Sequence, residues 1–192
     1  MDPLPSSLAT TDLPLTAILI GVVLAGSHLV GLLAPDACIA WARTVPRSRT
    51  WGTVLLSLAV TWAAVIAATT DLGEFSPMRT TVVGAIIIGG FLLWKFVPDF
   101  LSSRSLGLLL LLAAHPVLET TFLQNGLLKL ALAVLAYAWA LAGLFLVGMP
   151  YLHRDLITWI SSRRAIWTLL CWAGLLFGML LLLDGVRMMF LE

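Results

Sequence analysis

Two histidines lie in apolar stretches of the chain, and histidine can bind a metal-containing cofactor or carry a proton near neutral pH. His28 lies inside the apolar run 14–33. An imidazole there predicts an axial ligand to a haem iron or a chlorophyll magnesium, a proton relay, or a hydrogen bond to a neighbouring helix. Because His28 is a lone histidine in its run, we favour the hydrogen bond over cofactor binding.

His115 and Glu119 form the second group with potential chemistry. Residues four apart share a helical face, so an imidazole–carboxylate pair is expected. Pro116 frees the carbonyl oxygen of residue 112 and bends the helix, which can open a polar cavity. The pattern predicts a proton or ion site of a small transporter or channel, with His28 on the same pathway. The alternatives are a solvated Glu119 near the membrane boundary and a single axial ligand at His115.

A haem held by both His28 and His115 is not expected, because their depths differ by on the order of 10 Å. The sequence contains no catalytic triad, metal-ligand cluster, phosphate loop or nucleotide fingerprint. We therefore expect no enzymatic activity, no catalytic residues and no metal site, and no cofactor is required. Cys38 and Cys171 are expected to be free thiols that fill space at different depths.

The composition indicates whether these residues lie in water or in a lipid bilayer. Of the 192 residues, 60% are hydrophobic and 11% charged, and the mean hydropathy is +1.03. A soluble domain has about 45–50% apolar and about 25% charged residues. These numbers exclude a soluble enzyme, a disordered chain, a disulfide-stapled secreted domain and a nucleic-acid binder. The lipid bilayer is the first partner of this chain.

Six apolar segments are long enough to be membrane helices, since a span needs roughly 20 apolar residues. None shows the alternating polarity of a β-barrel strand. The first segment lacks a positive n-region and is expected to be retained rather than cleaved as a signal peptide. We predict an all-α integral membrane protein with one transmembrane domain over residues 1–192. The predicted spans are 14–33, 51–69, 81–97, 105–123, 127–148 and 166–183.

The distribution of basic residues predicts the orientation of the six spans. Eight of the eleven Lys and Arg residues fall in three loops, 34–50, 95–104 and 150–165, and these loops share one side if all six segments cross. The positive-inside rule makes that side cytoplasmic. We expect three helical hairpins in the plasma (inner) membrane, with both termini on the non-cytoplasmic side.

The three inner loops resemble one another. Each begins with a proline that ends the preceding helix and finishes with a basic or Ser-basic cluster, which indicates a weak internal repeat or the ordinary composition of cytoplasmic loops. Residues 151–160 and 36–45 form short amphipathic segments. Such segments are expected to lie flat at the headgroup boundary or to bind a cytoplasmic partner.

Small residues recur at the spacing of helix contacts. Helices in lipid associate through close van der Waals contact, which small side chains permit. We expect these residues to pack helices within the bundle, with contacts to another chain as the alternative. The residues are Ala59, Ala63, Ala67, Gly174 and Gly178.

These observations favour a non-catalytic polytopic subunit or scaffold of a larger inner-membrane assembly, with other membrane proteins as partners. The first alternative is a small transporter or channel that uses His115, Glu119 and His28. The second is a haem- or chlorophyll-binding protein with His28 or His115 as axial ligand.

Overall fold

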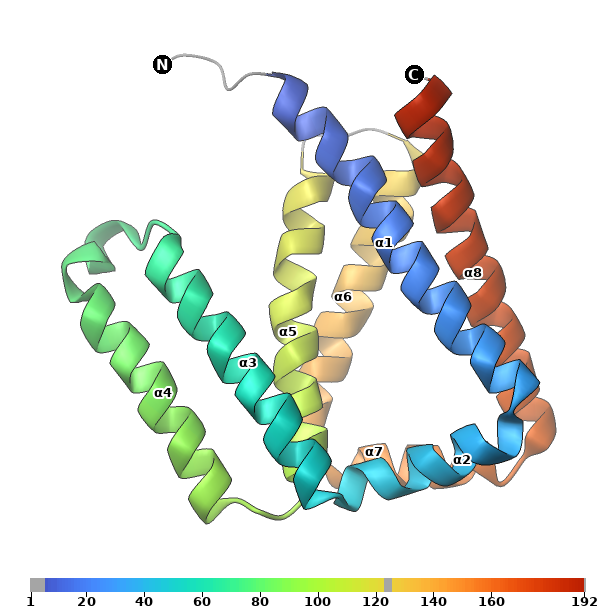
Figure 1. The fold of residues 1–192 in the computed structure, drawn as a ribbon, viewed down its shortest axis with the longest axis horizontal. Coiled ribbons are helices and arrows are strands. Elements are labelled where there is room, and N and C mark those ends of the chain that lie inside the picture. Colours follow the sequence, from blue (N-terminus) through green and yellow to red (C-terminus); the bar gives the residue numbers. More distant parts are fainter. Residues whose placement is uncertain (1–5, 123–125, 192) are drawn as a thin grey trace. The chain divides into compact units, whose positions relative to one another are not determined.

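The computed structural model describes residues 6–122 and 126–191, and within these ranges the regular elements are all helices (Figure 1). Among the described residues, six helices are long and apolar enough to cross a membrane, which confirms the prediction of an all-helical, multi-pass membrane protein. They are α1 (Ser6–Leu33), α3 (Arg49–Thr69), α4 (Arg79–Phe96), α5 (Leu101–Thr121), α6 (Leu127–Gly148) and α8 (Arg164–Leu191).

Several helices extend beyond the predicted spans, because backbone hydrogen bonding continues through polar residues that hydropathy excludes. The α3 helix begins at Arg49 rather than Trp51, and the hydroxyl of Ser48 accepts the Trp51 backbone N–H at 3.2 Å as an N-cap. The α8 helix continues to Leu191, past the predicted end at residue 183. Residue 123, the predicted end of the fourth span, lies outside the described residues.

Both amphipathic segments form helices, α2 (Pro35–Thr44) and α7 (Tyr151–Ser161). Their large apolar side chains are exposed, which is the arrangement of a helix that lies in the headgroup region. The described residues also form two short 3₁₀ helices, η1 (Val45–Arg47) and η2 (Gly73–Met78). The exposed apolar side chains are Trp41 on α2 and Tyr151, Leu152, Leu156 and Trp159 on α7.

The chain divides into two compact units, each made of several segments. The first contains residues 1–41, 114–138 and 158–192, and the second contains residues 42–113 and 139–157. The prediction of a single transmembrane domain over the whole chain stays a prediction.

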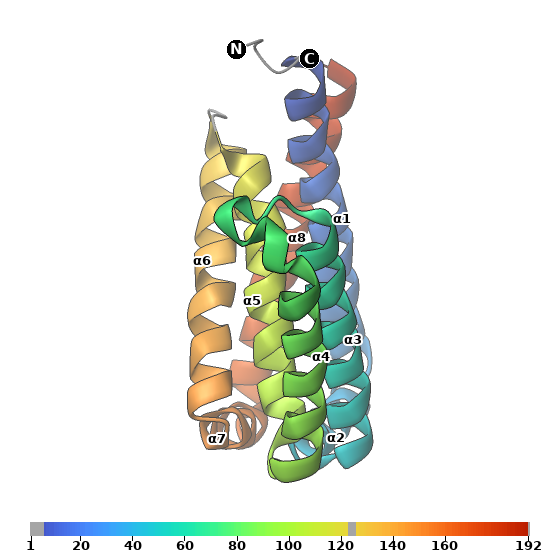
Figure 2. The same ribbon diagram turned by 90° about the vertical axis from the view of Figure 1, so that its left-hand side faces the viewer.

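The first unit is built on an antiparallel pair of helices, α1 and α8, which lie side by side in both views (Figures 1 and 2). Glycines allow their backbones to touch. A Cβ atom on Gly178 would lie 2.6 Å from the backbone nitrogen of Ala25, and one on Gly21 would lie 2.7 Å from the carbonyl oxygen of Gly178. Nearer the termini, a Cβ on Gly185 would lie 2.8 Å from the carbonyl oxygen of Pro14. No larger residue fits these positions without separating the helices.

Helices of the second unit also approach each other closely at glycines, and the sequence analysis did not single out these glycines. On α5 and α6, a Cβ on Gly107 would lie 2.8 Å from the carbonyl oxygen of Gly143, and the converse distance is also 2.8 Å. A Cβ on Gly52 of α3 would lie 2.9 Å from the backbone nitrogen of Ser102. Ser103 precedes Gly107 by four residues and Ala140 precedes Gly143 by three, so small-residue spacing is the available sequence signal for the α5–α6 contact.

Replacement of Gly21 by leucine should destabilise the protein, because the side chain would force α1 and α8 apart. Overpacking of this kind costs about 1–3 kcal/mol of the free energy of unfolding. Thermal unfolding in detergent micelles measures the loss. The matched control is Gly26→Leu on the same helix, where a Cβ meets no atom within 4 Å. Equal destabilisation by both variants would contradict close packing at Gly21.

Candidate functional site

His28 lies in the contact between α1 and α8, half-buried. Its Nδ1 is 2.8 Å from the carbonyl oxygen of Leu24, one turn earlier on the same helix. A carbonyl oxygen only accepts hydrogen bonds, so Nδ1 carries the proton in this contact. The unprotonated nitrogen of the neutral ring is therefore Nε2.

The Nε2 edge of His28 faces Gly174 on α8. A Cβ atom at Gly174 would overlap the Cδ2 and Nε2 atoms of the ring, so this glycine makes room for the imidazole. An axial ligand needs open space beyond its metal-binding nitrogen, and here the α8 backbone lies on that side. The geometry favours packing of His28 against a neighbouring helix. Ligation of haem or chlorophyll by His28 stays a prediction that would require α8 to move.

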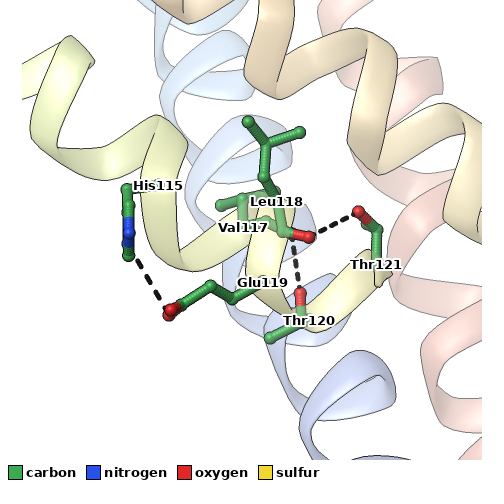
Figure 3. A network of polar contacts seen from close by, with 6 residues as sticks. All are labelled: His115, Val117, Leu118, Glu119, Thr120 and Thr121. Carbon is green, nitrogen blue, oxygen red and sulfur yellow. Dashed lines mark hydrogen bonds and ion pairs between the residues drawn. The ribbon is translucent and has the colours of Figure 1, made fainter. Parts of the chain in front are cut away.

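His115 and Glu119 form a pair on α5, with 3.6 Å between Nδ1 and Oε2 (Figure 3). Their side chains are 62% and 68% exposed, so the pair lies on the outside of its unit rather than in an enclosed pathway. The following hydroxyls, Thr120 and Thr121, donate to the carbonyl oxygens of Val117 and Leu118 at 2.9 and 2.8 Å. These hydrogen bonds lie within α5 and do not connect the hydroxyls to His115 or Glu119. A role in transport, or as a single haem or chlorophyll ligand at His115, stays a prediction.

The predicted packing residues lie in two helix faces. Gly174 and Gly178 lie against α1, as described above. On α3, Ala59 and Ala67 are buried and Ala63 is half-buried. The contacts of Gly174 and Gly178 lie within the first unit. A packing role for the three α3 alanines stays a prediction.

A buried polar cluster in the second unit was missed by the sequence analysis. Ser103 at the start of α5 is fully buried, and its Oγ lies 2.8 Å from Nδ1 of His153 on α7. Ser105 is also fully buried and donates to the carbonyl oxygens of Leu101 at 2.7 Å and Gly52 at 3.3 Å. The hydroxyl of Ser102 is buried without a hydrogen-bond partner. The sequence signal for this cluster is the presence of three serines within four residues at the start of α5.

The Ser103–His153 hydrogen bond holds the amphipathic helix α7 against the start of α5. Burial lowers the pKa of His153, because a buried site disfavours the charged imidazolium. A serine–histidine pair is also the core of a nucleophilic catalytic site. Ser103 has no exposed surface, so a substrate does not reach its oxygen in this structure. The Ser103–His153 hydrogen bond therefore serves as a structural link between α5 and α7.

The turn between α3 and α4 carries two ionic groups with internal partners. Asp71 accepts from the backbone N–H of Gly73 and the hydroxyl of Ser76, each at 3.0 Å, and these hydrogen bonds lower the pKa of its carboxyl. Arg79 donates to the carbonyl oxygens of Ala68 and Thr70, each at 3.0 Å. A cation at the C-terminal end of a helix offsets its dipole, so Arg79 stabilises the end of α3.

Within residues 6–122 and 126–191, no three His, Cys, Asp or Glu side chains are grouped to hold a metal ion. No protein-family model matches the chain, and no curated protein or solved structure matches it either.

The attachment of α7 should weaken as the pH falls below 6.5. The pKa of His153 is lowered when it is buried, so the detached or unfolded state binds the proton first. The stability is fully present above the unfolded pKa of about 6.5. It declines as the pH falls through that value, and the decline stops below the pKa of the buried ring.

Thermal unfolding of the wild type and His153→Gln between about pH 8 and pH 5.5 tests this dependence. Glutamine retains an acceptor for Ser103 and does not titrate. We expect a smaller fall in Tm for His153→Gln than for the wild type. Parallel falls in the two proteins would show that His153 does not control this pH dependence.

Proposed function

We propose that the chain is a non-catalytic subunit or scaffold of a larger assembly in the plasma (inner) membrane. Its partners are the lipid bilayer and other membrane protein subunits. The single observation that carries the proposal is the incomplete packing of α4. Only 6% of the apolar α4 segment is buried, against 17–39% in the other five spans.

One side of α4 is occupied within its own unit. Gly90 is buried, and a Cβ atom there would overlap the side chain of Val60 on α3. The two helices lie side by side and are joined by η2 (Figures 1 and 2). Of the glycines on α4, Gly90 makes this contact. A Cβ atom on Gly84 or Gly89 would meet no atom within 4 Å.

A second face of α4 carries small residues and has no neighbour. Thr81, Ala85 and Gly89 follow one another at four-residue spacing and therefore share a face. Thr81 and Ala85 are exposed, and a Cβ atom on Gly89 would meet no atom within 4 Å. Small residues are typical of positions where another helix backbone approaches closely in lipid. This face, which we call the α4 small-residue face, supports a contact with a helix of another subunit.

The proposed orientation follows from the charge distribution. Eight of the eleven basic residues lie in the loops 34–50, 95–104 and 150–165. By the positive-inside rule these loops face the cytoplasm, the spans form three hairpins, and both termini lie outside. In intact cells, Cys38 should then react with a membrane-permeant maleimide and stay unmodified by an impermeant one. Labelling of Cys38 by the impermeant reagent would contradict this orientation and indicate the opposite one.

A substitution in the α4 small-residue face should break the assembly without unfolding the chain. We expect Gly89→Leu to remove co-purifying partners after mild detergent extraction, because the leucine blocks close approach of a second helix. The measurement is the mass of the complex on native gels or by native mass spectrometry.

Gly84→Leu is the matched control on the same helix, since its Cβ also meets no atom within 4 Å and it lies off the face. It should retain the complex. A wild-type preparation that is monomeric and lacks partners would contradict the subunit proposal. An absorption spectrum of the same preparation separates the pigment alternative, because bound haem or chlorophyll gives a Soret or chlorin band.

A further inference from the structure

The end of α1 brings the two cysteines of the chain into one region. Cys38 lies in the first half of α2, and its Sγ donates to the carbonyl oxygen of Val30 at 3.6 Å. Cys171 on α8 contacts the next residue of α1, since its Sγ is 2.9 Å from the Cβ position of Gly31. Both sulfurs are free thiols. They flank one peptide unit of α1.

The separation of the two sulfurs is bounded by that peptide unit. Standard backbone dimensions between the Val30 oxygen and the Gly31 Cα place the sulfurs at most about 11 Å apart. A rotation about χ1 moves a cysteine sulfur by about 3 Å, so two rotations close a large part of the gap. The expectation that the cysteines lie at different depths stays a prediction.

The remaining movement would come from α2, in which no residue is buried. An exposed ion pair between Asp36 and Arg164 connects α2 to α8, and an ion pair at a surface contributes little rigidity. By contrast, α8 is fixed by its glycine contacts with α1 and by the Trp167 indole, which donates to the Gly31 carbonyl oxygen at 3.1 Å. Cys171 is therefore a fixed thiol and Cys38 a movable one.

We propose that Cys38 and Cys171 are a redox-active thiol pair that forms an intramolecular disulfide by exchange with a low-molecular-weight disulfide of the glutathione type. This modification site is independent of the subunit role. In the oxidised form, the disulfide links α2 covalently to α8, and in the reduced form this link is absent.

The exchange proceeds in two balanced steps. Cys38 is half-buried and Cys171 is buried, so the thiolate of Cys38 attacks the small disulfide first. A mixed disulfide forms at Cys38 and one small thiolate leaves. The thiolate of Cys171 then attacks the Cys38 sulfur, the protein disulfide forms, and the second small thiolate leaves. The two protein thiols lose two protons and two electrons, and the small disulfide is reduced to two thiols.

The test uses the full-length protein in detergent micelles, treated with oxidised glutathione and analysed by intact-protein and peptide mass spectrometry. We expect the wild type to lose both free thiols and to carry a Cys38–Cys171 disulfide without bound glutathione. The rate of disulfide formation should not depend on protein concentration. Reduction with dithiothreitol should restore both thiols.

Two single variants separate the steps. Cys171→Ser should accumulate the glutathione adduct at Cys38, because no second thiol resolves it. Cys38→Ser should react slowly and form no protein disulfide. A wild type that keeps glutathione on Cys38 with Cys171 reduced would overturn the proposal. Disulfide-linked dimers in place of the internal bond would overturn it as well. The wild-type measurement stands even if a variant does not fold, and none of these outcomes depends on whether other subunits bind.

Discussion

The packing of the first unit depends on direct contact between the backbones of α1 and α8. In a bilayer, helices gain little by hiding apolar side chains from one another, because the lipid tails are equally apolar. Close van der Waals contact must hold the pair together. Gly21, Gly178 and Gly185 make that contact, each with a Cβ position that falls within 3 Å of a backbone atom of the opposite helix. Gly31 and Gly174 instead make room for the side chains of Cys171 and His28.

Other features of this unit follow from the same contact. The ring of His28 fits beside α8 because residue 174 has no side chain. The indole of Trp167 reaches the Gly31 carbonyl oxygen, and Cys171 is brought to the end of α1. A single helix pairing thus positions the imidazole, the indole and one of the two thiols.

Hydropathy predicted the six apolar helices, since a membrane span is a local property of about 20 residues. The orientation predicted from the charge distribution stays a prediction. The same-face relation of His115 and Glu119 was predicted for a similar reason, because four residues of sequence determine it. The partners of His28 and His153 were not predictable, because the contacts with Gly174 and Ser103 join residues that are far apart in the chain. The small-residue spacing around Gly107 and Gly143 does not identify their partners.

The turn between α3 and α4 has a consequence for the insertion of the chain into the membrane. Asp71 and Arg79 carry opposite charges, and both are hydrogen-bonded to groups of the turn or of the adjoining helix end. Moving bare charges and open carbonyls through hydrocarbon is costly, whereas groups that are already paired lose less hydration. In the proposed orientation, in which this turn crosses the membrane, a preformed α3–α4 hairpin would therefore meet a lower barrier to translocation than the same residues in an extended chain. Arg79 bound in this way is also a weaker signal for retention on the side of synthesis than a free arginine would be.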